Sequence, residues 1–376
     1  MKVSSFRMRD SVVMDSGSQN ETGQSFEHEP TFKQRVTKFW QWYPTVAERF
    51  FETIEAGKCG SLVDEVAEYC ESTIPGLSWV FGPGENGGHS FTLSGEGQIA
   101  KQLLAEYWLQ RAPEIPKWTF HASRQATPSE FVKGFAISVD EGNRVDVDGF
   151  QVRTHVDDER QKIDILAWHP VLERVPQAQH FTILFLLVDE VLGEFGTQTW
   201  LGEIKIEPFT PDAYTRSLSD LPEFISHVNT YHKWEKLPPL ETYCVYQLKE
   251  TKPSPRGDTV VGSSLIPKLV FDCIDNDGKL SEDPLKNMGA ELVYVAIDGS
   301  VFPEGQQSDV RANIEDVLTD SLEKELSGQT LGGAFGLNES YIDVLLVDGQ
   351  ESRRIVSETL AQLQLASRSR IESFVD

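Results

Sequence analysis

The stretch Glu291-Leu-Val-Tyr-Val-Ala-Ile-Asp298 predicts a strand that is buried on both of its faces. Every residue between its two acidic ends is apolar or aromatic, whereas a strand with one face in water alternates apolar and polar residues. Helices packed on one face of the sheet would bury only the side chains that point to that face. We therefore expect a second part of the chain to pack on the other face.

The residues after this strand predict a complete small domain. A helical stripe is followed by a glycine-rich hairpin, a second helix and a last strand, which gives the order β-α-β-β-α-β. This order is that of the ferredoxin-like split βαβ unit, and we predict it for the C-terminal domain. The predicted elements after the first strand are Ser308–Leu326, Gly332–Gly336, Tyr341–Val347, Glu351–Leu365 and Arg370–Val375.

Asp343 is a charged residue inside the otherwise apolar strand Tyr341–Val347. A buried carboxylate is costly unless a hydrogen bond or a counter-charge accompanies it. We expect Asp343 either at a sheet edge or facing a partner.

Upstream of residue 209, the sequence predicts helices and antiparallel strands of the same general kind. An aromatic stripe predicts a helix from Thr31 to Gly57, and Ser61 is placed to cap a second helix. Strands at Leu77–Phe81, His89–Leu93 and Trp118–Ser123 surround a helix at Ile99–Trp108. The predicted fold class is thus α+β, with an N-terminal domain of related helix-on-sheet layers.

The segment from Trp118 to Ile206 predicts a second β-α-β-β-α-β unit, with Trp118–Ser123 as its first strand. Thr127-Pro-Ser-Glu130 has the form of a capping box, and apolar residues at helical spacing continue to Val139. The other predicted elements are strands Arg144–Val156 and Lys162–His169, helix Phe181–Leu192 and strand Thr199–Ile206.

Composition shifts divide the chain into four parts. Residues 1–30 are polar and aperiodic, which predicts a disordered tail or an upstream start, because Met8 and Met14 could also initiate. Residues 31–208 form the predicted N-terminal domain and residues 266–376 the C-terminal domain. The proline-rich residues 209–265 are predicted to connect them, with Thr251–Asp258 as an exposed loop.

The charge balance restricts the class of partner. The chain has 376 residues, with 59 acidic against 34 basic ones and a net charge of −25. Such a surface repels nucleic acid and anionic lipid and attracts a basic protein. The longest apolar run, Phe181–Val188, is too short to span a membrane, and the polar N-terminus predicts no secretory signal. We expect a cytoplasmic protein, and an exposed edge strand would also allow homodimerisation.

The sequence motifs do not predict a cofactor or a metal site. Gly82-Pro-Gly-Glu-Asn-Gly87 matches the dinucleotide fingerprint in letters, but His89–Leu93 after it alternates like a strand, which predicts a hairpin loop. Asp275-Asn-Asp-Gly278 lacks acids at both ends of a calcium loop and predicts a tight turn between strands. Cys59, Cys70, Cys244 and Cys273 have no metal-ligand spacing; the first two would be nucleophiles only beside a distant histidine.

Two functions remain open from the sequence. The first is a non-catalytic protein that binds and regulates a protein partner, which the net charge and the missing catalytic motif favour. The second is an enzyme with a cleft between its domains near the Gly82–Gly88 loop. The candidate site residues for an enzyme are Glu85, His89, His121, Arg124 and Asp343.

Overall fold

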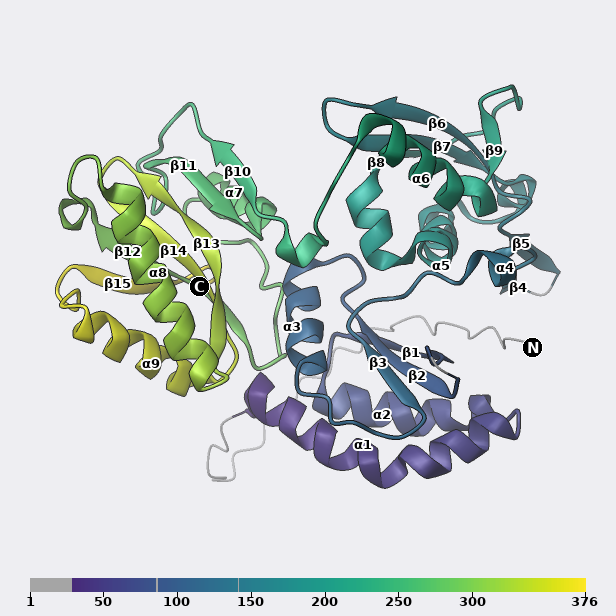
Figure 1. Ribbon diagram of the computed structural model, residues 1–376, viewed down its shortest axis with the longest axis horizontal. Coiled ribbons are helices and arrows are strands. Elements are labelled where there is room, and N and C mark those ends of the chain that lie inside the picture. Colours follow the sequence, from purple (N-terminus) through teal and green to yellow (C-terminus); the bar gives the residue numbers. More distant parts are fainter. Residues whose placement is uncertain (1–28, 86, 141) are drawn as a thin grey trace, which may run out of the picture.

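The computed structural model describes residues 29–376 apart from residues 86 and 141. In this part the chain folds as mixed α+β, with helices packed on several sheets (Figure 1). Residues 1–28, most of the predicted disordered tail, lie outside the described residues. None of the described helices has both the length and the apolar character that a membrane-spanning helix needs.

A large antiparallel sheet organises the C-terminal part of the chain, with its strands in the order β10-β11-β13-β14-β12-β15. Helices α8 and α9 lie on its near face in Figure 1. The first strand predicted above matches β12 residue for residue. The elements are β10 (Cys244–Gln247), β11 (Thr259–Ser264), α7 (Pro267–Asp275), β12 (Glu291–Asp298), α8 (Gln307–Lys324), β13 (Gly328–Gly336), β14 (Glu339–Leu346), α9 (Gly349–Gln362) and β15 (Ser369–Ser373).

Strand β12 is buried on both faces, as its sequence predicts. Val293, Val295 and Ile297 pack into the core beneath α8 and α9. Leu292 and Tyr294, on the opposite face, belong to a core shared with the N-terminal helices. The expected second layer is therefore the N-terminal part of the same chain.

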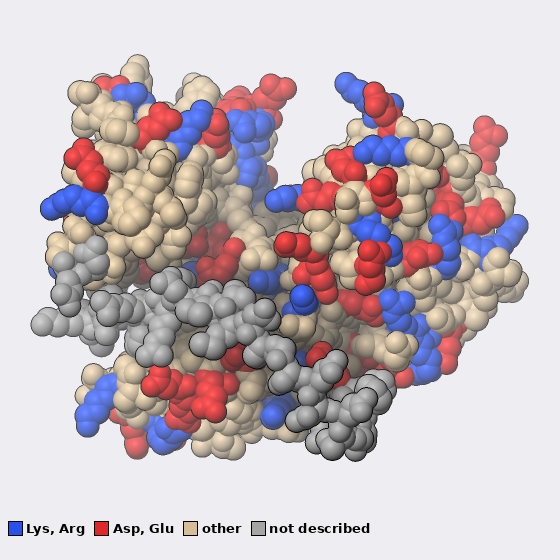
Figure 2. All heavy atoms as spheres, turned by 180° about the vertical axis from the view of Figure 1, so that it is seen from behind, with Lys and Arg blue, Asp and Glu red and all other residues tan. Residues whose placement is uncertain are grey.

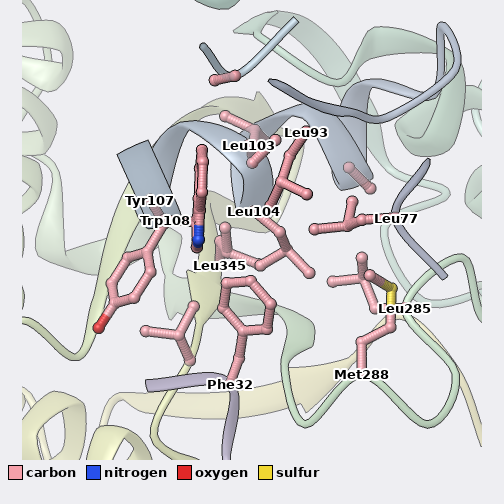
Figure 3. Packing of buried hydrophobic residues seen from close by; sticks show 14 of the residues in the cluster. Phe32, Leu77, Leu93, Leu103, Leu104, Tyr107, Trp108, Leu285, Met288 and Leu345 are labelled. Atoms are coloured by element: carbon pink, nitrogen blue, oxygen red, sulfur yellow. The ribbon is translucent and has the colours of Figure 1, made fainter. Parts of the chain in front are cut away.

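The first unit, residues 32–121, supplies that second layer. Figure 3 shows Leu345 of β14 packed among Phe32, Leu104 and Trp108 of this unit. Thr31 and Gln34 start its first helix with a capping box. Its elements are α1 (Phe32–Glu55), α2 (Val63–Thr73), β1 (Ser78–Pro83), β2 (His89–Ser94), α3 (Ile99–Leu109) and β3 (Trp118–His121), the strands forming a small sheet in the order β1-β2-β3.

The elements from α4 to α6 form a middle lobe with a core of its own, between Val132 and Trp234. Its main sheet has the order β8-β7-β6-β9, and β4 and β5 pair as a separate hairpin. The elements are α4 (Ser129–Val132), β4 (Ala136–Asp140), β5 (Asn143–Asp146), β6 (Gln151–Asp157), β7 (Lys162–Trp168), α5 (His180–Trp200), β8 (Leu201–Ile206), β9 (Thr215–Ser217) and α6 (Leu221–His232).

The predicted helix after Thr127 is mostly wrong. Helix α4 ends at Val132, Gly134 turns the chain with a positive φ of 78°, and β4 begins at Ala136. Phe135, Ile137 and Val139 pack on the lobe core at a spacing of two. The same apolar residues fit a helix or a strand, and the glycine turn decides for the strand.

The predicted second β-α-β-β-α-β unit is also wrong. Strand β3 pairs in parallel with β2, and therefore belongs to the small sheet rather than to the middle lobe. The single strand expected from Arg144 to Val156 is divided into β5 and β6. A local pattern predicts that a strand exists but not which sheet it joins.

The connecting loops agree with the prediction at Gly82–Gly88 and differ from it in three other places. The Gly82–Gly88 loop does join antiparallel β1 and β2 as a hairpin. Asp275–Gly278 ends α7 instead of joining two strands. Ser61 lies in a short 3₁₀ turn and does not cap α2, whose cap position is Leu62. In the predicted exposed loop Thr251–Asp258, Arg256 is buried.

Candidate functional site

The five residues predicted as site candidates lie on two different sheets. Glu85, His89, His121 and Arg124 lie around the small sheet of the first unit. Asp343 lies on β14, inside the large sheet. Asp343 is therefore described separately from the other four.

His89 and His121 do not face one another. His89 is buried, with 8% of its surface exposed, and its Nε2 lies 3.0 Å from Glu55 Oε1. It is paired with Trp118 across the parallel strands, whereas His121 lies three residues further along β3. Three residues cover about 10 Å of strand and place the two side chains on opposite faces.

Glu85 lies close enough to His121 to influence its charge. Burial lowers the pKa of His121, and the Glu85 carboxylate opposes this shift. The Glu85 backbone N–H also donates to Thr119 Oγ1 at 3.3 Å, which holds the loop against β3. These two residues are the pair that the structure brings together from the candidate set.

Arg124 is held at the junction with the middle lobe. Its guanidinium lies 2.7 Å from Glu96 Oε1, and its backbone N–H donates to Glu194 Oε2 at 3.3 Å. Two surface hollows, of about 400 and 550 Å³, lie instead at one end of the large sheet, and none of the five candidates lines either of them. No group of three or more His, Cys, Asp or Glu within the described residues is arranged to hold a metal ion.

Asp343 faces a charged partner inside the protein. Its Oδ1 accepts a hydrogen bond from Arg256 Nη1 at 2.5 Å, and both side chains are completely buried. Ser264 Oγ lies 3.5 Å from the other carboxylate oxygen. The expectation of a sheet edge is wrong, because β14 lies between β12 and β13 and is not an edge strand. The acid instead faces Arg256 of the same chain.

Aromatic rings enclose the Arg256 guanidinium. The ring centroids of Tyr294, Tyr341 and Phe374 lie 4.9, 5.2 and 5.3 Å from its Cζ atom. The Nε and Nη2 atoms are buried without a hydrogen-bond acceptor, and the guanidinium gains instead from the rings around it. Arg256 stays charged at any physiological pH, so the pair holds the loop before β11 onto the sheet and is not built to exchange protons.

The two cysteines considered as nucleophiles lack the environment that such a role needs. Burial raises the pKa of the Cys59 thiol, and raises that of Cys70 much further. A catalytic cysteine has a lowered pKa, because the thiolate is the reactive form. The described surroundings therefore favour inert thiols at both positions.

Strand β10 is an edge of the large sheet that exposes apolar side chains. Val245 is 75% exposed and Tyr243, just before the strand, is 47% exposed. The Leu248 N–H donates to Val260 O at 2.8 Å. Because hydrogen-bonded and free positions alternate along an antiparallel strand, the backbone groups of Val245 and Gln247 point away from β11.

The side chains beside this edge form a surface that we name the β10 shelf: Tyr243, Val245, Gln247, Val261 and Ser263. Val245 pairs with Ser263 and Gln247 with Val261, so these side chains share one face of the sheet. Val261 in turn pairs with Phe335, which packs beneath α8. Glu315 of α8 contributes to the raised pKa of Tyr243, so the helix borders the shelf.

Comparison of the chain with protein-family models, with curated proteins and with solved structures finds no match.

Proposed function

We propose that this chain is a non-catalytic protein-binding protein, with a regulatory role, that takes up an extended segment of a basic partner protein along β10. The observation that carries this proposal is the apolar, exposed edge strand. Natural sheet edges are usually blunted by charge, by proline or by a cover. Strand β10 is not blunted in this way. It exposes the Val245 side chain and backbone N–H and C=O groups that point outward, and an edge of this kind suits the addition of a further strand.

The charges on α8, the helix that borders the shelf, support a basic partner. The exposed face of α8 carries four acids, namely Asp309, Asp316, Asp320 and Glu323. The whole chain has a net charge of −25. Complementary charge speeds association and favours basic over acidic segments. A matching segment alternates apolar residues, which contact the shelf, with lysine or arginine.

The large sheet also supports the finer fold assignment. Its strands β13, β14, β12 and β15 follow the order and the antiparallel directions of a ferredoxin-like unit, and we propose that fold for the C-terminal domain. In that arrangement β10 and β11 extend the sheet beyond the part that α8 covers. The division at residues 209–265, the cytoplasmic location and a homodimer remain predictions from the sequence.

The Val245→Pro substitution is expected to weaken binding of a short labelled peptide of alternating valine and lysine by at least about tenfold, or about 1.4 kcal/mol. Proline removes the outward N–H of Val245, which strand addition needs, and leaves the bonds to β11 in place. Fluorescence anisotropy at low salt measures the dissociation constant. Higher salt is expected to weaken the wild-type complex.

Val245→Thr is the matched control, because threonine keeps the branched side chain and the N–H group. It should bind the peptide nearly as well as the wild type. A second control is a peptide of alternating valine and glutamate, which the acidic helix should reject. Equal affinity of wild type and Val245→Pro, or equal binding of the two peptides, contradicts the proposal.

A further inference from the structure

The middle lobe and the first unit meet through polar groups. The lobe core runs from Val132 to Trp234, and the core that contains the first unit is a separate cluster. Figure 2 shows the surface hollowed between the middle lobe and the part that holds the large sheet. Parts of a chain that meet mainly through polar groups tend to move relative to one another.

Glu194 of α5 is the centre of this polar contact. The side chain is buried, with 2% of the residue exposed. Its carboxylate accepts hydrogen bonds from Ser94 Oγ at 2.8 Å, from the Gly97 N–H at 2.9 Å and from Gln102 Nε2 at 2.6 Å. The Arg124 N–H also points to it at 3.3 Å. Four donors thus converge on one carboxylate. One of them lies at the end of β2, one lies in the loop between β2 and α3, one lies on α3, and one lies in the chain that follows β3.

The backbone of α5 is shaped to present this residue. Gly193 has φ 73° and ψ 160°, a conformation outside the helix that glycine alone adopts readily. A Cβ atom at Gly193 would lie 3.1 Å from the Arg124 carbonyl oxygen, so the chain leaving β3 passes directly over the break. The Glu194 N–H donates to that same oxygen at 2.9 Å.

Hydrogen bonds between residues 94–102 and α5 in the described part of the chain all end on Glu194 or on Gln198, one turn later. Each is a bond that water would replace if the parts separated, so the net stabilisation of each is small. A carboxylate that has left these donors would in addition be well hydrated. Separation of the two parts therefore exchanges these bonds for bonds to water.

We propose that Glu194 is a latch that holds the middle lobe against the first unit, and that releasing it lets the lobe swing about the chain segments that join it to the rest. This device is independent of what binds at the β10 shelf. It would change the width of the hollow between the lobes.

The test measures the distance between the lobe and the large sheet by pulsed electron spin resonance on the full chain. Spin labels are placed at Tyr231→Cys on α6 and Ser357→Cys on α9, in a background in which Cys59→Ser and Cys244→Ser remove the less buried thiols. Glu194→Gln is expected to at least double the width of the distance distribution, because the amide of glutamine presents donors to the donors of the first unit.

Glu203→Gln is the matched control, because Glu203 lies in the same lobe with an exposed side chain on β8. It should leave the distribution as in the wild type. If Glu194→Gln fails to fold, Ser94→Ala removes a single donor and is expected to broaden the distribution by a smaller amount. A wild-type distribution in the folded Glu194→Gln protein, or in Ser94→Ala where that variant is used, overturns the latch.

Discussion

Replacing Asp343 with alanine is expected to lower the free energy of unfolding by about 3–5 kcal/mol, because it leaves the Arg256 charge buried without a counter-charge. Both side chains have no exposed surface, so water cannot replace the carboxylate without opening the sheet. Denaturant unfolding followed by tryptophan fluorescence measures the effect, since Trp40 and Trp108 lie in the core that packs on this sheet.

Two further variants separate the buried charge from other causes. The double substitution Arg256→Met with Asp343→Leu is expected to recover most of the lost stability, because it removes both charges and keeps the volume. Glu291→Ala removes the acid of a partly exposed pair with Arg353 and should cost no more than about 1 kcal/mol. A loss below about 1 kcal/mol for Asp343→Ala would show that the ion pair is not isolated from water.

The C-terminal unit could be predicted from the sequence because local and long-range signals agree there. Glu291–Asp298 has branched and aromatic residues that favour a strand, and it also occupies the centre of the sheet. The predicted helices Ser308–Leu326 and Glu351–Leu365 overlap α8 and α9. Local preference and final packing thus demand the same structure.

The middle lobe could not be predicted in the same way. Residues 131–139 satisfy both a helical and a strand pattern, and Gly134 decides between them only in the folded chain. Strand β3 was recognised, but its pairing with β2 depends on contacts between segments that are distant in the sequence. The local sequence pattern does not predict pairing of this kind.

The ion pair shows the same limit at the level of single residues. Asp343 is conspicuous in the sequence, because it is an acid in an apolar strand, and the two expectations for it were a sheet edge or a partner. Its partner Arg256 lies 87 residues away, in a proline-rich loop that looked exposed. A charge on such a loop is normally solvated, so only the three-dimensional structure shows that this arginine points inward.

Replacing Asp189 with asparagine is expected to stabilise the middle lobe by about 2–3 kcal/mol at pH 7.5. The pKa of Asp189 is raised from 3.8 to about 6, mainly by burial and in smaller part by the charges of Glu194 and Glu96, while Thr197 and Arg124 oppose the shift. Because the folded state holds this proton more tightly than the unfolded chain, the wild type loses stability as the pH rises from about 4 to about 6 and no more above that.

Hydrogen exchange of the β7 amides reports the stability of the middle lobe separately from that of the core shared by the first unit and the large sheet. The wild type should exchange faster at pH 7.5 than at pH 5, after correction for the intrinsic rate, whereas Asp189→Asn should lose this part of the pH dependence. Asparagine keeps the acceptor for Thr197 Oγ1, which now lies 2.7 Å from the carboxylate. Asp320→Asn, on the exposed face of α8, should behave like the wild type. An unchanged pH dependence in Asp189→Asn would assign the effect to Glu190, whose pKa burial also raises.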